Sequence, residues 1–353
     1  MRVRSMWKKW IITSAAALFL LVGCNKEEAV EKEQQDDIIV EEEDEVNPPE
    51  SVELPYQYPL TGMGSADEVE GRAVAVMVNN HPKARPQSGL NQADIVYELL
   101  AEGDITRFLA IFQSEKPNNV GPVRSAREYY IELAKGYDSL FVAHGYSPEA
   151  EKMLKNGYVD HLNGMEYDGT LFKRADFRKA PHNSYITFDN ILKGAEQNDY
   201  EMDQAPDSLV FLTDEEIEAL AGNQANQINI SYFNSTFDSR LEYDEEIMKY
   251  KRFSDGEQTV DYDSEDPVLI DNLFVVETEH KVIDDSGRRE IDLTSGGKGY
   301  LFQRGKVLEV DWKNVEGKIL PYLNGEVVGF VPGKTWINII PTKPGLSEAV
   351  TFE

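Results

Sequence analysis

Hydrophobic and polar positions in the first half of the chain predict a mixture of strands and helices. The continuous apolar run at 73–78 is typical of a buried strand. Two further strands are expected at 94–100 and 105–112, joined at a Gly103–Asp104 turn. A short strand is predicted at 140–143. Helices are predicted at 125–136, 148–156, 187–197 and 214–221.

Capping signals place the starts of three of these helices. Ser147 followed by Pro148 suits a helix start, because proline is tolerated at the first helical position. Thr213 and Glu216 have the spacing of a capping box. Ser125 and Glu128 have the same spacing, so a helix is expected to begin near Ala126.

Beyond a polar joint at 223–227 the pattern changes to strands separated by glycine turns. The predicted strands lie at 228–233, 269–277, 299–303, 307–312, 327–330 and 336–340. We therefore predict a mixed α/β domain at 55–200, a helix and polar joint at 201–224, and a mainly β domain at 225–353.

The first 54 residues carry a different pattern. A basic segment precedes an apolar run, Ile11 to Val22, that is shorter than the roughly 20 residues needed to span a bilayer. Such a segment is typical of a secretory signal peptide, here 1–23. Because Cys24 follows directly, the segment resembles a bacterial lipoprotein signal, in which the cysteine sulfur is lipidated and carries acyl chains such as palmitate. An ordinary signal peptide with a chance cysteine and a short membrane anchor are the alternatives.

Composition limits the classes of partner. The net charge of −29 disfavours nucleic acid and anionic headgroups. Residues 24–54 are rich in acidic side chains, which predicts an extended, disordered tether. Membrane attachment is therefore expected through the lipid on Cys24, on the extracytoplasmic side. With one cysteine and no close histidine pair, we predict no disulfide, no metal site and no cofactor.

Three polar segments carry the candidate chemistry. Loop 79–89 follows the first buried strand and places Asn80, Arg85 and Gln87 on a stiff turn. Segment 121–128 would put Arg124 and Arg127 at a helix start, where their charges need an anion or an internal acid. Segment 172–183 is basic within an acidic protein and contains the candidates Arg178, His182 and Asn183.

These segments leave two alternatives open for each cation. Arg85, Arg107, Arg124, Arg127 and Arg178 form an anion-binding pocket if they converge, and otherwise pair with internal acids such as Asp94, Glu98 or Glu102. Glu98 is also a candidate for the pocket, and in an enzyme Glu98 or His182 would serve as the acid or base. His144 and His182 suit either general acid–base chemistry or a hydrogen-bonded structural role.

Several motifs together resemble the YerB-like lipoproteins of Gram-positive bacteria, a family of unknown function. They are Val76–Leu90, Ala93–Glu98, Ile105–Phe108, Gly121–Arg127, Pro181–Asn183, Gly297–Tyr300, Asp311–Lys313 and Pro332–Ile337. The resemblance implies an α+β fold, a layered β-β-α sandwich, with a mainly β C-terminal domain. It transfers no catalytic residue, because the family has no assigned activity.

The predicted function is a membrane-anchored binding or scaffolding module at the cell envelope. Its expected partners are the membrane, through Cys24, and either cell-wall synthesis proteins or an anionic glycan. The first alternative is an enzyme that acts on an anionic cell-wall polymer or a lipid-linked precursor through an arginine-lined pocket. A sensor of a soluble anionic ligand is a further alternative.

Overall fold

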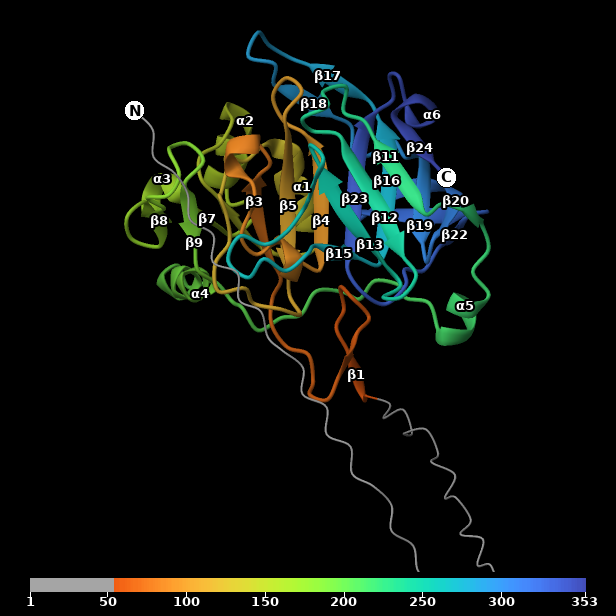
Figure 1. The fold of residues 1–353 in the computed structure, drawn as a ribbon. Coiled ribbons are helices and arrows are strands. Elements are labelled where there is room, and N and C mark those ends of the chain that lie inside the picture. Colours follow the sequence, from red (N-terminus) through yellow and green to blue (C-terminus); the bar gives the residue numbers. More distant parts are fainter. Residues whose placement is uncertain (1–53) are drawn as a thin grey trace, which may run out of the picture. The chain divides into compact units, whose positions relative to one another are not determined.

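A computed structural model describes residues 54–353 (Figure 1). The predicted signal peptide, Cys24 and nearly all of the predicted tether lie outside the described residues. Within the described part, no helix is both long enough and apolar enough to cross a membrane.

A twelve-stranded mixed sheet forms the centre of the fold. Its strands follow the order β22 (Glu326–Val327), β21 (Lys318–Leu323), β20 (Lys306–Val315), β19 (Gly297–Gln303), β16 (Asn272–Thr278), β23 (Thr335–Pro341), β4 (Ile95–Leu100), β5 (Thr106–Phe112), β3 (Val74–Asn79), β6 (Leu140–Ala143) and β7 (His161–Asn163), and β10 (Asn223–Gln224) pairs with β20.

A six-stranded sheet lies over one face of the central sheet. It consists of β14 (Glu257–Gln258), β13 (Lys249–Ser254), β12 (Ser239–Asp244), β11 (Gln227–Ile230) and β24 (Val350–Phe352), with β15 (Leu269–Ile270) paired to β13. Three small hairpins complete the strands: β1 (Tyr56–Gln57) with β2 (Gly64–Ser65), β8 (Phe172–Arg174) with β9 (Ser184–Ile186), and β17 (His280–Val282) with β18 (Arg289–Ile291).

The helices are short. They are α1 (Glu128–Gly136), α2 (Pro148–Lys155), α3 (Gly164–Tyr167), α4 (Phe188–Gln197), α5 (Asp214–Glu218) and α6 (Leu346–Ala349), with 3-10 turns at Pro82–Ala84 and Leu90–Gln92.

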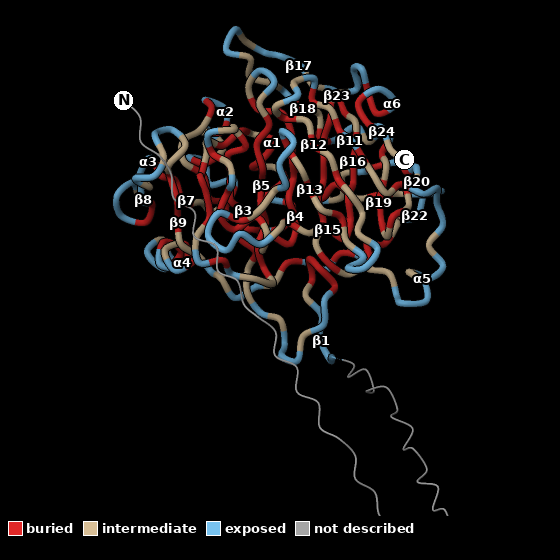
Figure 2. The backbone as a smooth tube through the Cα atoms, in the orientation of Figure 1, coloured by how far each residue is buried: buried red, intermediate tan, exposed pale blue. Residues whose placement is uncertain are grey.

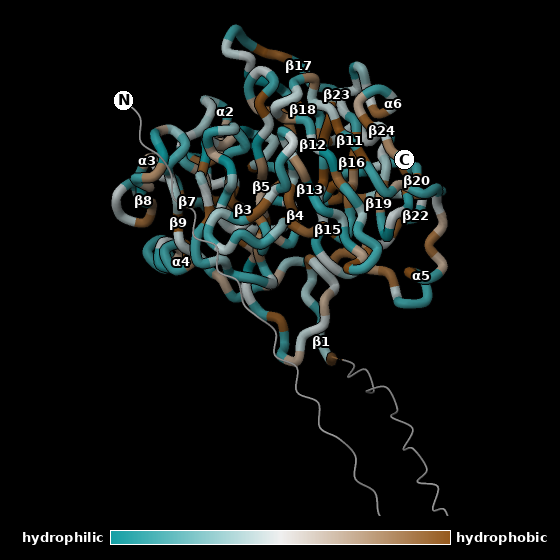
Figure 3. Tube along the Cα trace, in the orientation of Figure 1, coloured by the Kyte–Doolittle hydropathy of each residue, from teal (hydrophilic) through white to brown (hydrophobic). Residues whose placement is uncertain are grey.

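Strand alternation produces the layers. In β3, Val76 faces the same cluster as Leu241 and Tyr250 of the second sheet, whereas Met77 faces a cluster that contains Tyr130 of α1. Both faces of the central sheet are therefore covered, by the second sheet on one side and by α1 and α2 on the other. This layered β-β-α arrangement confirms the predicted α+β fold. Figures 2 and 3 show the buried, hydrophobic strands inside and the polar, exposed loops around them.

The two halves of the sequence share the central sheet. Strand β23, near the C-terminus, lies between β4 and β16 and is parallel to both. Figure 1 shows β23 beside β4. The segments 55–200 and 225–353 thus contribute neighbouring strands to one sheet, and all described residues, 54–353, belong to one compact unit.

Most local predictions agree with the structure, and one helix start is wrong. The Gly103–Asp104 turn joins β4 to β5, Ser147 caps α2, and Thr213 forms the capping box of α5. The helix predicted from Ala126 instead begins at Glu128, with Arg127 as its N-cap. Ser125 cannot cap it, because the preceding backbone is still extended: Ala126 N–H donates to Gly145 O, and the Ser125 hydroxyl donates to His144 O.

Candidate functional site

Polar side chains collect where the parallel strands β3, β6 and β7 end. Asn79 closes β3, His144 directly follows β6, and Asn163 closes β7. Because the carboxyl ends of parallel strands meet at one edge of a sheet, this edge is where open α/β sheets usually bind ligands. Loop 79–89 begins at this edge and leads to the largest concentration of predicted site residues.

A buried ionic network lies between the two sheets under this loop. Glu98 of β4 is 0% exposed and Arg252 of β13 is 1% exposed, and Arg252 Nη2 donates to Glu98 Oε2 at 2.9 Å. The Arg252 guanidinium also lies 4.7 Å from the centre of the Trp336 ring. The other donors to the Glu98 carboxylate are Asn80 Nδ2, Thr106 Oγ1, Trp336 Nε1 and Asn338 Nδ2.

This network explains how Glu98 is accommodated. An isolated carboxylate without water is very unfavourable, and a paired, fully hydrogen-bonded one is tolerated. Glu98 is therefore the internal counter-ion of Arg252. None of the five predicted arginines pairs with it.

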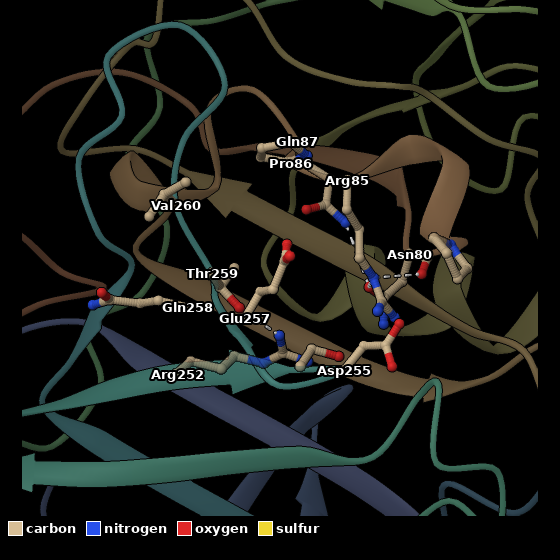
Figure 4. A pocket seen from close by; sticks show the side chains of 12 residues that line it. Asn80, Arg85, Pro86, Gln87, Arg252, Asp255, Glu257, Gln258, Thr259 and Val260 are labelled. Atoms are coloured by element: carbon tan, nitrogen blue, oxygen red, sulfur yellow. Dashed lines mark hydrogen bonds between the residues drawn. The ribbon is translucent and has the colours of Figure 1, made fainter.

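A cavity of about 210 Å³ opens above this ion pair, between loop 79–89 and the β13–β14 hairpin (Figure 4). Among the predicted residues, Asn80, Arg85 and Gln87 line it. Gln87 is buried and donates through Nε2 to Asn79 O at 2.9 Å, which braces the loop from inside. The structure thus brings together the three residues that were singled out in this loop.

Arg85 is the cation at the cavity. Its Nε donates to Asn80 O and Oδ1, each at 3.1 Å, and its Nη2 donates to Thr236 O at 2.9 Å. Its Nη1 is buried and has no partner among the described residues. Burial, and then the nearby Arg252, lower the pKa of Arg85 to about 10. A negative group in the cavity would relieve both effects.

Two carboxylates lie opposite Arg85. Asp255 and Glu257 line the cavity from the β13–β14 hairpin, and both are exposed. In Figure 4 the side chains of Arg85, Asp255 and Glu257 approach the same space. Neither acid has an ion-pair partner among residues 54–353, so the cavity presents a cation and two anions to a ligand.

Segment 259–266, which follows the hairpin, holds the loop in place. Gly89 has a φ of +88°, and its N–H donates to Asp261 Oδ2 at 2.5 Å. Tyr262 N–H donates to Gln87 O at 2.8 Å, and its ring stacks on Phe177 with centroids 4.6 Å apart. The acidic stretch 261–266 therefore has a structural role through Asp261.

Arg178 also braces this loop. Its guanidinium donates to Ala84 O and Pro86 O and lies 5.1 Å from the centre of the Tyr262 ring. Its donors are thus directed at backbone carbonyls, and it does not line the cavity.

Arg107 and Arg127 share an internal acid. Arg107 Nη2 lies 2.6 Å from Glu102 Oε2, and Arg127 pairs with the other oxygen, Oε1. Arg127 thus has an internal acid as its partner, which is one of the two alternatives given for it above. The five predicted arginines accordingly do not line one pocket: Arg85 alone lines the cavity.

His144 occupies a closed network. Arg174 Nη2 lies 2.8 Å from His144 Nε2, and because guanidinium only donates, Nε2 is the acceptor. The proton of the neutral ring is then on Nδ1, which lies 2.7 Å from Ser184 Oγ. Arg174 is in turn paired with Asp168, and Asn183 donates to Ala175 O. His144 and Asn183 therefore support the architecture around the strand ends.

His182 and Arg124 lie near loop 79–89 but do not line the cavity. The His182 ring stacks on His81 with centroids 4.5 Å apart, and Arg124 Nη1 contacts Pro181 O at 3.4 Å. Among residues 54–353, no group of three or more histidine or acidic side chains is arranged to hold a metal ion.

Sequence reasoning missed Arg252, Asp255, Glu257 and Thr259. In the structure Arg252 shares the inward face of β13 with Tyr250 and Ser254. The sequence does not show this, because the charged Arg252 points inward and the apolar Phe253 points outward, against the usual polar alternation of a strand.

Comparisons with known proteins agree with this architecture. The N-terminal domain of the family described as "Protein of unknown function (DUF3048)" matches residues 60–201, and its C-terminal domain matches 228–337. The chain belongs to this family of α+β lipoproteins, the YerB-like family.

Two relatives support the assignment. "Putative lipoprotein YerB" of Bacillus subtilis (strain 168) is 49% identical over 339 residues, which cover 95% of this chain and 96% of the relative. The crystal structure of the YerB protein from Bacillus subtilis matches with a TM-score of 0.78 and 51% identity, covering 84% of this chain and 99% of that one.

Proposed function

We propose that the protein is a lipid-anchored, extracytoplasmic binding module whose cavity takes a small zwitterionic ligand, an amino acid or the end of a short peptide. The observation that carries this proposal is the buried, unpartnered Nη1 of Arg85 at a cavity that also presents Asp255 and Glu257. Arginine suits a carboxylate, which accepts from its planar fork of donors.

The size and charge of the cavity support this ligand class. Pockets for drug-sized molecules have volumes of about 300–1,000 Å³, so a cavity of about 210 Å³ suits a smaller molecule. A ligand carboxylate would contact Arg85, and a ligand ammonium group would contact Asp255 and Glu257. Peptide-bearing envelope material provides such groups at the cell surface, where lipidation at Cys24 would place the protein.

The lining residues favour binding over catalysis. Thr259 Oγ1 accepts from Arg252, and Ser254 Oγ donates to Asp238 O at 3.2 Å. Glu98, the acid proposed for the enzymatic alternative, is fully buried and ion-paired. His182, the other candidate, does not line the cavity. The enzymatic alternative would need an arginine-lined pocket, and these arginines contact separate partners instead.

Calorimetry tests the proposal with matched ligands. Alanine and alanyl-alanine carry both charges, alaninamide lacks the carboxylate, and propionate lacks the ammonium group. We expect binding of the zwitterions, weaker binding of both single-charge analogues, and loss of binding in Arg85→Gln. Arg174→Gln, which removes an arginine that does not line the cavity, is the control. Equal affinity of Arg85→Gln and the unmodified chain, or no binding of any zwitterion at millimolar concentration, refutes the proposal.

The partner at the envelope requires a separate experiment. Cell-wall synthesis proteins and an anionic glycan are both proposed as partners of the anchored protein. In-cell crosslinking of the lipidated chain, followed by partner identification, distinguishes protein capture from glycan capture. Recovery of neither class argues against a scaffolding role.

A further inference from the structure

Two stacked histidines stand at the edge of the central sheet, one of them in loop 79–89 and neither among the residues that line the cavity. His81 follows β3, and His182 precedes β9, so the two rings come from segments about a hundred residues apart. Their centroids are 4.5 Å apart and their planes are inclined by 29°. Neither ring lines the Arg85 cavity.

Hydrogen bonds define the tautomer of both rings. Lys83 N–H donates to His81 Nδ1 at 3.1 Å, and a backbone N–H cannot accept. Asn79 Oδ1 accepts from His81 N–H at 3.0 Å, which orients the Asn79 amide so that its Nδ2 donates to His182 Nδ1 at 2.9 Å. Both Nδ1 atoms are therefore acceptors. In the neutral rings the proton lies on Nε2, so both rings present an Nε2–H donor.

Further cationic donors lie beside the pair. Arg124 has one long side-chain hydrogen bond, 3.4 Å from Nη1 to Pro181 O, and its Nε has no partner among residues 54–353. Lys83 is exposed, and no ion pair to it occurs in the described part of the chain. Arg178 is the other cation near His182, and its donors are already directed at Ala84 O and Pro86 O.

The strongest charges around the His81 and His182 rings are positive. Burial first, and then the neighbouring cations, lower the pKa of His81 and lower that of His182 to about 4. The largest charge effects at the two rings come from cations, namely Lys83, Arg85, Arg124 and Arg178. This is unusual in a chain with a net charge of −29, where acids outnumber bases. An anion bound here would favour the charged form of each of these groups and accept from the unpartnered Nε of Arg124.

We propose that His81, His182, Arg124 and Lys83 form a second binding site, which takes a phosphate group. A phosphate offers several acceptor oxygens to the two Nε2–H donors, the Arg124 guanidinium and the Lys83 ammonium group. The proposed zwitterion cavity differs in kind, since it pairs its cation with two acids. A free phosphate, a phosphodiester polymer and a lipid headgroup share this chemistry, and the probes below distinguish these three sources.

Histidine side-chain NMR on the full chain tests this site directly. The sequence contains five histidines, so His144, His161 and His280 serve as internal references. At neutral pH we expect His81 and His182 to be Nε2–H tautomers and His144 to be the Nδ1–H tautomer. Inorganic phosphate should shift the first two rings in a saturable manner and raise their pKa. Unprotonated Nε2 on either ring, or no shift with phosphate, overturns the proposal.

Matched variants test which side chains donate to the bound phosphate. Removal of a hydrogen bond to a charged group costs about 1.5–3 kcal/mol, so Arg124→Gln should weaken phosphate binding roughly tenfold or more. The Arg124 side chain makes a single long contact, so the variant should remain folded, and Lys83→Gln provides a second, exposed substitution. Arg174→Gln removes a nearby guanidinium that is paired with Asp168 and should leave the affinity unchanged. Equal losses in both arginine variants would show a general charge effect and overturn the site.

Three probes distinguish the sources of phosphate. Inorganic phosphate represents a free ion, glycerol phosphate oligomers represent a polymer, and phosphatidylglycerol vesicles represent a lipid surface. Arg124-dependent binding that is tightest for one probe identifies the source. Arg85→Gln should retain phosphate binding while it loses the zwitterion, so failure of one site is distinguishable from failure of the other.

Discussion

Removing the charge of Glu98 should strongly destabilise the fold. Glu98 and Arg252 are 0% and 1% exposed, and their ion pair of 2.9 Å joins the two sheets. Glu98→Gln leaves the Arg252 cation buried without its counter-ion, with only neutral side-chain acceptors, Thr259 Oγ1 and the new amide oxygen, beside it. Breaking a buried pair in this way costs about 3–5 kcal/mol. For a domain whose total stability is about 5–15 kcal/mol, that is a large fraction.

Urea unfolding measures this cost, and a double variant tests its cause. Arg252→Met alone should also destabilise, because it leaves the Glu98 carboxylate with neutral donors. The double variant Glu98→Gln with Arg252→Met should cost much less than the sum of the two single changes, since no charge is then left unpaired. A coupling energy near zero would refute the interpretation of the pair as mutual counter-ions.

An exposed pair provides the control. Arg240 of β12 pairs with Glu242, and both side chains are 38% exposed. Surface pairs of this kind contribute about 0–1 kcal/mol, so Arg240→Gln should change the unfolding free energy little. If Glu98→Gln cost no more than Arg240→Gln, burial would not be the decisive factor at Glu98.

Three further predictions follow from the structure and the sequence. The pKa of His182 is about 4 in the folded chain and about 6.5 in the unfolded chain. Between these two pH values the unfolded chain binds more protons than the folded one. The free energy of unfolding should therefore fall as the pH is lowered from about 6.5 to 4. His182→Asn should flatten that slope in urea unfolding, and an unchanged slope would contradict the assignment. Gly164→Ala places a methyl group against the His144 ring, so overpacking should cost about 1–3 kcal/mol and lower the thermal midpoint; an unchanged midpoint would show that the ring can move freely. Cys24→Ser should transfer the protein from the detergent to the aqueous phase in a partition assay, whereas continued membrane association would indicate that the apolar run 11–22 is itself the anchor.

Local interactions made much of the fold predictable. The capping box at Thr213 and Glu216, the Ser147 cap and the turn at Gly103–Asp104 depend on residues within a few positions of one another, and each is present. Ser125 shows the limit of this approach. Its spacing to Glu128 is correct, but pairing of Ala126 with Gly145 keeps the chain extended past the predicted start.

The candidate site was only partly predictable. Loop 79–89 stood out because polar and turn-forming residues follow a buried strand, and Asn80, Arg85 and Gln87 do line the cavity. The partners of the arginines could not be assigned, since Glu102, Glu98 and Asp94 were equally available acids. Folding brings Arg107 and Arg127 to Glu102, and it brings Glu98 to Arg252, 154 positions away.

The sequence alone determined many local features of this protein: most strands of the central sheet, the starts of α2, α4 and α5, and the loop that concentrates polar side chains. It did not indicate β12, β13 or β21. Backbone sterics, caps and side-chain alternation act over a few residues, so a linear pattern records them. The tertiary structure alone decided that β23 lies between β4 and β16, that the β13–β14 hairpin closes the cavity over Arg85, and that His81 meets His182. Those contacts join segments far apart in the chain, and they depend on backbone pairing and burial between strands that no local pattern specifies.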